Sequence, residues 1–237
     1  MLIAIEGIDG SGKGTQGKLL LERARREGLR AELLAFPMYE RSFFGREIGR
    51  YLNGEFGDLW AVHPKLAATL YAGDRFESAA QVKRLGEALD LVICDRYTAS
   101  NQAHQAAKLP AGERAEFFAW VERLEHDVFG VPRPDRVLFL DLPPEVASSL
   151  IEKKEARSYT DRKADIHEDD TGYLAAVHAA YRELSARAEW VTISCLEEGA
   201  MLPIEEIHER IWREVTGPAP ASPLYSRVPE TPRDESL

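Results

Sequence analysis

Residues 2–15 read LIAIEGIDGSGKGT, a short apolar run followed directly by a glycine-rich segment. Residues 2–6 are almost wholly apolar, which is typical of a buried parallel strand. A glycine-rich turn follows at once, and residues 15–28 then carry leucines at helical spacing and stop at Gly28. The order of strand, turn and helix predicts a ligand site at the carboxyl end of the first strand, the edge at which parallel sheets bind ligands.

The turn has the Gly-x4-Gly-Lys core of a phosphate-binding loop. Glycines let backbone N–H groups surround phosphate oxygens without Cβ clashes, and the next helix points its positive end at the same place. Lys13 adds a full charge that reaches the transferred phosphate. The residues predicted to hold the phosphates of ATP are Gly7, Ile8, Asp9, Gly10, Ser11, Gly12, Lys13, Gly14 and Thr15. The competing interpretation is a glycine-rich turn that holds no ligand.

One position departs from the strict form of this loop. The strict pattern has Ser or Thr directly after the lysine, where the hydroxyl holds Mg²⁺, whereas here Gly14 follows Lys13 and Thr15 comes next. Thr15 can still meet a phosphate. The sequence therefore gives no support for a direct bond between a hydroxyl at position 14 and magnesium.

Strands and helices alternate along the rest of the chain. Further strands are predicted at residues 31–36, 91–94, 136–140 and 190–194, and further helices at 44–52, 66–85, 113–129, 172–188 and 203–215. This alternation predicts an α/β fold with a doubly wound five-stranded parallel sheet and helices on both faces, the three-layer arrangement of P-loop NTPases. We expect one domain at residues 1–216, and a disordered tail at residues 217–237, which are rich in Pro, Ser and charge.

Composition narrows the class of protein. The 237 residues carry a net charge of −10, which argues against a general nucleic-acid binder because phosphate backbones need a basic face. The two cysteines are far apart and show no metal-ligand spacing, which fits a reducing compartment. The N-terminus lacks the basic start of a signal peptide, and no apolar run reaches the length of a membrane span. We expect a cytoplasmic protein with neither a nucleic-acid nor a membrane partner.

A second chemical element follows the strand predicted at residues 91–94. Asp95 and Arg96 stand at its carboxyl end, which places them beside the phosphate loop in a doubly wound sheet. Asp95 can hold a water on Mg²⁺, and Arg96 can clamp an acceptor phosphate through two parallel hydrogen bonds. The competing interpretation is a salt-bridged strand end on the surface.

Taken together, these motifs resemble the thymidylate kinase family over most of residues 1–215. The matching segments are Glu6-Gly7-Ile8-Asp9-Gly10 with Lys13, Phe36-Pro37-Met38-Tyr39, Tyr71-Ala72-Gly73-Asp74-Arg75, Asp95-Arg96-Tyr97 with Ser100 and Asn101, and Asp165-Ile166-His167-Glu168. The phosphate loop alone is specific only to phosphate binding, whereas the joint pattern in this order is far more specific. The resemblance implies direct in-line transfer of a phosphate from ATP to thymidylate (dTMP) with Mg²⁺, a step in dTTP synthesis.

The resemblance also assigns an acceptor site. Asp9 would accept a hydrogen bond from the sugar 3′-hydroxyl and help to place magnesium. Tyr71 would stack on thymine, while Arg75 would donate to thymine O4 and Asn101 would read N3. The implied dTMP-binding residues are Asp9, Phe36, Pro37, Tyr39, Tyr71, Arg75, Arg96, Ser100, Asn101 and His167. Two plainer interpretations stay open, namely Tyr71 as a core residue and Asp74 with Arg75 as a surface pair.

A charged segment at about residues 152–166 matches the position of the family's lid, although a solvated charged loop is the competing interpretation. Gly10 stands where some members carry an arginine, and members without that arginine place a catalytic one in the lid. The resemblance therefore implies Arg157 or Arg162, with no choice between them. The implied catalytic residues are Asp9, Lys13, Arg96, Arg157 and Arg162, and the implied metal-binding residues are Asp9, Asp95 and Glu168.

Competing functions remain. His104 and His167 replace residues that are commonly tyrosine in the region that would exclude a ribose 2′-hydroxyl, so the resemblance does not imply a strict preference for deoxyribose. One alternative is a kinase of the same class for UMP, dUMP or a deoxynucleoside. Another is a regulatory P-loop NTPase, although no convincing Asp-x-x-Gly and Asn-Lys-x-Asp set is present. The resemblance also implies a homodimer, with the apolar face of residues 113–129 as one candidate surface and burial of that face within the monomer as the alternative.

Overall fold

The computed structural model describes residues 1–155 and 171–217. Five parallel strands form its central sheet in the order β2-β3-β1-β4-β5. These strands are β1 (Leu2–Glu6), β2 (Ala31–Ala35), β3 (Leu91–Asp95), β4 (Arg136–Asp141) and β5 (Trp190–Ser194). Every residue of β1 is buried, as expected for a parallel strand that is covered on both faces. The predicted five-stranded parallel sheet is confirmed.

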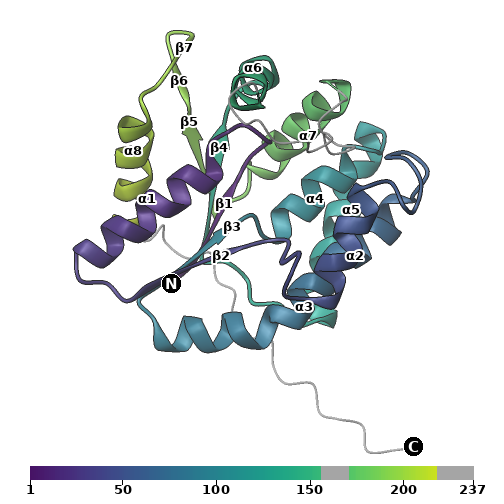
Figure 1. Cartoon of the computed structure of the whole chain (residues 1–237), viewed down its shortest axis with the longest axis horizontal. Helices are drawn as coiled ribbons and strands as arrows, with labels where there is room; N and C mark the ends of the chain where they lie inside the picture. Colours follow the sequence, from purple (N-terminus) through teal and green to yellow (C-terminus); the bar gives the residue numbers. More distant parts are fainter. Residues whose placement is uncertain (156–170, 218–237) are drawn as a thin grey trace, which may run out of the picture.

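Helices cover both faces of this sheet, as Figure 1 shows. On one face α1 (Lys13–Arg26) packs against α8 (Ile204–Thr216), and on the other lie α3 (Pro64–Ala88), α4 (Thr98–Ala106) and α7 (Thr171–Leu184). Outside this second layer, α2 (Phe43–Leu52) packs on α3, and α5 (Ala111–Glu122) packs on α4. The structure also contains α6 (Pro144–Glu155) and a short hairpin of β6 (Leu196–Glu197) and β7 (Ala200–Met201). The predicted three-layer arrangement is confirmed.

One predicted helix is divided in the structure. The sequence predicts a single helix over residues 113–129, but α5 ends at Glu122 and a π-helical segment, η1 (Arg123–Val128), continues the chain. Wider π-helical turns often occur at functional sites. Here the turn carries a fully buried carboxylate, that of Glu125.

Two helices have no predicted counterpart. In α4 the buried residues include Ser100, Asn101, Gln102 and Gln105 as well as alanines, so no apolar stripe marks it in the sequence. Helix α6 was not predicted, and its last residues, 152–155, are ones that the sequence analysis placed at the start of the lid. Parts of the predicted lid and tail lie outside the described residues, namely residues 156–166 with Arg157 and Arg162, and residues 218–237. The same holds for His167 and Glu168, which follow the lid. The roles assigned to these residues stay predictions.

The carboxyl ends of three adjacent strands meet at one edge of the sheet. Asp95, the last residue of β3, pairs with Ile5 of β1 on one side and with Ala35 of β2 on the other. The chain continues this pairing beyond the strands, because Phe36 N donates to Asp95 O at 3.0 Å and Arg96 N donates to Ile5 O at 3.1 Å. The glycine-rich loop, the Phe36–Pro37 turn and the Asp95–Arg96 strand end therefore share this edge. The Phe36–Pro37 peptide bond is cis.

No helix in the described part of the chain joins the length and the apolar character that crossing a bilayer requires.

Candidate active site

The loop after β1 has the backbone geometry of an anion cradle. Gly7 has a φ of 149°, and a Cβ there would lie 2.7 Å from Ser11 Oγ and 2.9 Å from Leu140 O, so only glycine fits. Gly12 occupies the N-cap of α1 with a φ of 91° and has no side chain with which to cap the helix. The first N–H groups of α1 therefore stay available to a ligand, and the helix N-terminus favours negative charge.

Two side chains of the loop face this cradle. Lys13 is 6% exposed, and its Nζ donates a hydrogen bond to Ile8 O at 2.8 Å. Burial lowers the pKa of Lys13 to about 8, with a further contribution from Arg96 that Asp9 partly offsets. The buried Ser11 Oγ finds no hydrogen-bond partner among the described residues. A buried cation and an unpartnered hydroxyl suit a site that receives phosphate oxygens.

The lowered pKa of Lys13 predicts a pH dependence of nucleotide binding. Below pH about 8 the ammonium carries the charge that attracts phosphate, and as the pH rises through that value the free protein loses the proton. The affinity for a non-hydrolysable ATP analogue should therefore fall between pH about 7 and about 9, by at most about tenfold per pH unit, with proton uptake on binding. Calorimetric titrations in two buffers of different ionisation enthalpy measure both quantities.

The variant Lys13→Arg is the matched control, since a guanidinium keeps its charge over this range. Its pH dependence should be flatter than that of the wild-type protein. Equal wild-type affinity across the range, with no proton uptake, would contradict the role given to the ammonium.

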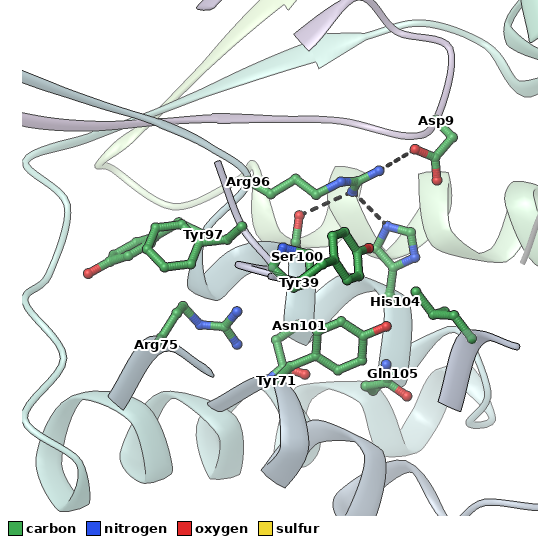
Figure 2. Close-up of a pocket in the computed structure, with 13 residues that line it drawn as sticks. Asp9, Tyr39, Tyr71, Arg75, Arg96, Tyr97, Ser100, Asn101, His104 and Gln105 are labelled. Atoms are coloured by element: carbon green, nitrogen blue, oxygen red, sulfur yellow. Dashed lines mark hydrogen bonds and ion pairs between the residues drawn. The ribbon is translucent and has the colours of Figure 1, made fainter. Parts of the chain in front are cut away.

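Arg96 joins the strand end to the phosphate loop. Its backbone has a φ of 63°, a left-handed conformation that residues other than glycine seldom adopt and that is often found at functional sites. In Figure 2 its guanidinium extends to Asp9, with which it forms an ion pair. Burial would raise the pKa of Asp9, but the charges of Arg96 and Lys13 outweigh it and hold that pKa well below the usual value. The predicted neighbourhood of Asp9, Lys13 and Arg96 is confirmed.

Glu6, at the end of β1, holds the turn that presents Arg96. This carboxylate is fully buried and accepts hydrogen bonds from Tyr97 N at 2.7 Å, from Ser100 Oγ at 2.6 Å and from Tyr181 Oη at 2.9 Å. Burial raises the pKa of Glu6. The sequence showed it only as part of a motif, with no role of its own. It ties β1 to the start of α4 and so fixes the backbone around Arg96.

Asp95 lies beside the first turn of α1. A Cβ on Gly14 would lie 3.1 Å from Asp95 Oδ2. The Asp95 carboxylate would therefore crowd any larger residue at position 14. Oxygen ligands suit Mg²⁺, which is often held by one or two carboxylates together with substrate phosphates and water. Asp9 and Asp95 fit such a site. Residues 1–155 and 171–217 contain no group of three potential His, Cys, Asp or Glu ligands, and Glu168 lies outside them.

A pocket opens beside Arg96, and its lining reaches Asp9 of the phosphate loop. Figure 2 shows the rings of Tyr39 and Tyr71 among the side chains that line this pocket, together with Arg75 and Asn101. The lining residues are Asp9, Phe36, Pro37, Tyr39, Leu52, Tyr71, Arg75, Arg96, Tyr97, Ser100, Asn101, His104 and Gln105. All the predicted dTMP-binding residues within the described ranges lie in this set, and only His167 falls outside those ranges. Tyr71 is half-buried and lines the pocket, so its interpretation as a core residue is wrong.

Arg75 belongs to a buried ion pair that the sequence did not predict. Its Nε and Nη2 both donate to the carboxylate of Glu125, the Nη2 bond measuring 2.7 Å, and both residues are almost fully buried. Asp74 faces elsewhere, where it accepts hydrogen bonds from Met38 N and Ser42 Oγ and so fixes the turn after Pro37. The interpretation of Asp74 and Arg75 as a surface pair is wrong.

Two amide side chains leave polar atoms for a ligand. Asn101 Nδ2 donates to Ala68 O at 3.0 Å and to Glu125 Oε1 at 2.7 Å, which fixes the orientation of the amide. Its buried Oδ1 has no partner among the described residues, and neither polar atom of the fully buried Gln105 has one. Because buried polar atoms are normally satisfied, these three atoms point to a polar ligand. Gln105 was missed in the sequence; its spacing of four residues from Asn101 is the signal that could have found it.

Ser100 makes contacts within the protein. Its hydroxyl donates to Glu6 and accepts from Arg96 Nη1 at 3.3 Å, and it also contacts Tyr181 Oη at 2.9 Å. Although it lines the pocket, these bonds assign it mainly to the support of Arg96. The sequence predicted only that it lies near the base.

Comparison with known proteins supports one family. Residues 5–211 match the family described as thymidylate kinase. A thymidylate kinase of Mycobacterium tuberculosis is 37% identical over 198 residues, covering 81% of this chain and 91% of that protein. A probable thymidylate kinase of Methanocaldococcus jannaschii is 31% identical over 213 residues, covering 89% and 93%. A thymidylate kinase structure from Candida albicans superposes with a TM-score of 0.64 at 24% identity, covering 90% of this chain and 89% of the other, and supports the fold. The chain therefore belongs to the thymidylate kinase family of P-loop phosphotransferases.

Proposed function

We propose that this enzyme phosphorylates dTMP to dTDP with ATP and Mg²⁺. One observation carries the proposal: the pocket lined by Tyr71, Arg75 and Asn101 opens onto Arg96, which is paired with Asp9 of the phosphate loop. A nucleoside monophosphate with its base in this pocket would place its phosphate at Arg96. ATP bound in the loop would then face that phosphate across Asp9.

The described residues support direct in-line transfer. An oxygen of the acceptor phosphate would attack the γ-phosphorus of ATP, and the bond from that phosphorus to the bridging oxygen of ADP would break. Lys13 and Arg96 supply fixed positive charge from the two sides, which is the main catalytic requirement of phosphoryl transfer. Mg²⁺ held by Asp9 and Asp95 would add charge neutralisation at the phosphates. Arg157 and Arg162 stay predicted contributors from the lid, and Glu168 a predicted metal ligand.

The hydrogen-bond pattern of the pocket supports thymine as the base. The Arg75 ion pair with Glu125 uses Nε and Nη2, and we propose the remaining Nη1 as the donor to thymine O4. The fixed Asn101 amide offers Oδ1 as an acceptor for the N3 hydrogen. Cytosine reverses both groups, with an amino group at position 4 and a bare N3, so it would leave buried polar atoms unpaired. Gln105 is a further candidate for contact with the bound nucleotide.

An acceptor panel tests this function. The protein is incubated with Mg-ATP and dTMP, dUMP, UMP, CMP, dCMP or AMP, and the diphosphate products are separated and quantified. The proposal expects the highest kcat/KM with dTMP and turnover with dCMP lower by a factor of about a hundred or more, since sites built on hydrogen bonds reject mismatched edges strongly. If dTMP turns over no faster than AMP, CMP and UMP, the assignment of the acceptor fails.

We also propose a homodimer, through a surface that shares only Val128 with the face of residues 113–129 that the sequence suggested. The apolar residues of α5 (Phe117, Phe118 and Val121) are buried in the monomer, so that face is not free to bind a second copy. Instead, Phe43, Phe76 and Val128 on α2, α3 and η1 are 58%, 53% and 65% exposed, on helices that pack together. Exposed apolar side chains gathered on one face commonly mark an interface.

The variant Phe76→Glu is expected to shift this protein from dimer to monomer in analytical ultracentrifugation, because it places a charge within that apolar face. Met201→Glu, on β7 and 40% exposed in the wild-type protein, is the matched control and should leave the association unchanged. A Phe76→Glu protein that sediments as the wild type does would contradict the proposed surface.

A further inference from the structure

His104 lies where α4 and α7 meet beside Arg96. Its Nε2 is 3.1 Å from Arg96 Nη1, and its Nδ1 is 3.2 Å from the hydroxyl of Tyr173. That hydroxyl in turn donates to the backbone oxygen of His104 at 3.0 Å. Figure 2 shows the imidazole of His104 facing the guanidinium, with Ser100 on the neighbouring turn.

These contacts select one tautomer of the imidazole. When the Tyr173 hydroxyl donates its hydrogen to the backbone oxygen of His104, it can accept from Nδ1 only if Nδ1 carries a hydrogen. A guanidinium has donors only, so the Nε2 that faces Arg96 must present a lone pair. Together, these contacts favour the neutral, Nδ1-protonated ring in the free protein. A partner that fixes the tautomer of a functional histidine is a common device in proteins.

The neutral imidazole of His104 can orient the Arg96 guanidinium without neutralising its charge. One carboxylate, Asp9, already pairs with this guanidinium. A second carboxylate at position 104 would compete with the acceptor phosphate for the charge, whereas an imidazole lone pair orients the guanidinium and adds no negative charge. Ser100 Oγ, the other contact of Nη1, is neutral as well. Arg96 is thus held in place by neutral groups on its Nη1 side and keeps its charge for a phosphate.

We propose that His104 is a positioning residue, which holds Arg96 in the orientation that receives the acceptor phosphate, and that Tyr173 fixes the tautomer in which it can do so. This inference rests on the proposed function and adds to it a mechanism by which α7 reaches the phosphate site. The proposed role of His104 affects binding of the acceptor phosphate, whereas Arg75 and Asn101 select the base.

Three variants test this role through steady-state kinetics with dTMP. His104→Leu removes the acceptor, and kcat/KM for dTMP should fall about 10- to 100-fold while the KM for ATP stays within about twofold. His104→Gln restores an acceptor oxygen at the place of Nε2 and should recover most of that loss. Tyr173→Phe removes the hydroxyl that fixes the tautomer and should give a smaller loss than His104→Leu.

A spectroscopic measurement makes the test independent of the stability of the variants. In the wild-type protein, ¹⁵N spectra of the histidine rings should show Nδ1 of His104 protonated and Nε2 bare. Wild-type kinetics in the His104→Leu protein, equal losses in His104→Leu and His104→Gln, or an Nε2-protonated ring would each overturn the inference. Failure of the proposed function is distinguishable, because then the wild-type protein itself would not turn over dTMP, and the same variants would be compared on whichever acceptor the panel identifies.

Discussion

Replacing Lys13 with alanine will lower kcat about a thousandfold or more and leave the fold intact. The side chain is buried at the phosphate loop, and in the proposed reaction its charge would face the negative charge that builds up on the transferred phosphate. Removal of a fixed donor or cation from such a site costs two to three orders of magnitude or more, roughly, because little water can take its place. The effect should fall on kcat as well as on ATP binding, since the charge acts most strongly in the transition state.

The same variant should not destabilise the protein. Burial lowers the pKa of Lys13 to about 8, below its unfolded value, so at neutral pH the burial of the charged form opposes folding. Loss of the ammonium removes that cost, and the thermal midpoint of Lys13→Ala should equal or exceed that of the wild type. Lys18→Ala, an exposed position on the same helix, is the matched control and should leave kcat unchanged. A kcat for Lys13→Ala within about tenfold of the wild-type value would contradict the phosphate-loop assignment.

Replacing Arg75 with methionine will destabilise the protein as well as weaken base selection. The guanidinium and the Glu125 carboxylate form an ion pair with exposed fractions of 2% and 0%, so the variant leaves a buried charge without its partner. Breaking a buried pair in this way costs about 3–5 kcal/mol of unfolding free energy. The Asn101 amide bonded to the same carboxylate should also lose its fixed orientation, and the preference for dTMP over dCMP should shrink.

A double variant separates these two effects. Arg75→Met with Glu125→Gln removes both charges and keeps an amide oxygen that can accept from Asn101. Its stability in urea should recover much of the loss, because replacing both members of a buried pair by neutral groups is far less costly than removing one. Its base selection should stay weak, since the variant lacks the donor that we propose for thymine O4. Arg84→Met, an exposed site on the same helix, should change stability by no more than about 0.5 kcal/mol. A loss below about 1 kcal/mol for Arg75→Met with unchanged selectivity would remove Arg75 from the site.

The sequence was informative where local patterns and the logic of parallel sheets suffice. The apolar run of β1, the glycine spacing of its loop and the Asp95–Arg96 strand end each carry a short-range signal. The rule that parallel strands present ligand sites at their carboxyl ends then brings Asp9 and Arg96 together, as the ion pair confirms.

The partners of the site residues could not be predicted in this way. Glu125 lies in a stretch of mixed charges, a pattern typical of a solvent-exposed segment. It contacts Arg75, 50 positions away in sequence, because η1 packs on α3. Gln105 lies on α4, whose buried face mixes polar and apolar residues and so gives no helical period. Glu6 did have a detectable signal, an acidic residue within an otherwise apolar buried strand, since a buried charge needs partners.

In the proposed enzyme, the phosphate loop and the pocket beside Arg96 form one cleft that holds two nucleotides phosphate to phosphate. Adenosine and thymidine joined through their 5′ positions by a chain of phosphates test it directly. We expect this compound to inhibit competitively against both ATP and dTMP, and to bind more tightly than either nucleotide alone. Inhibition that is competitive against only one substrate, or a complex that holds the compound and a separate dTMP together, would contradict it.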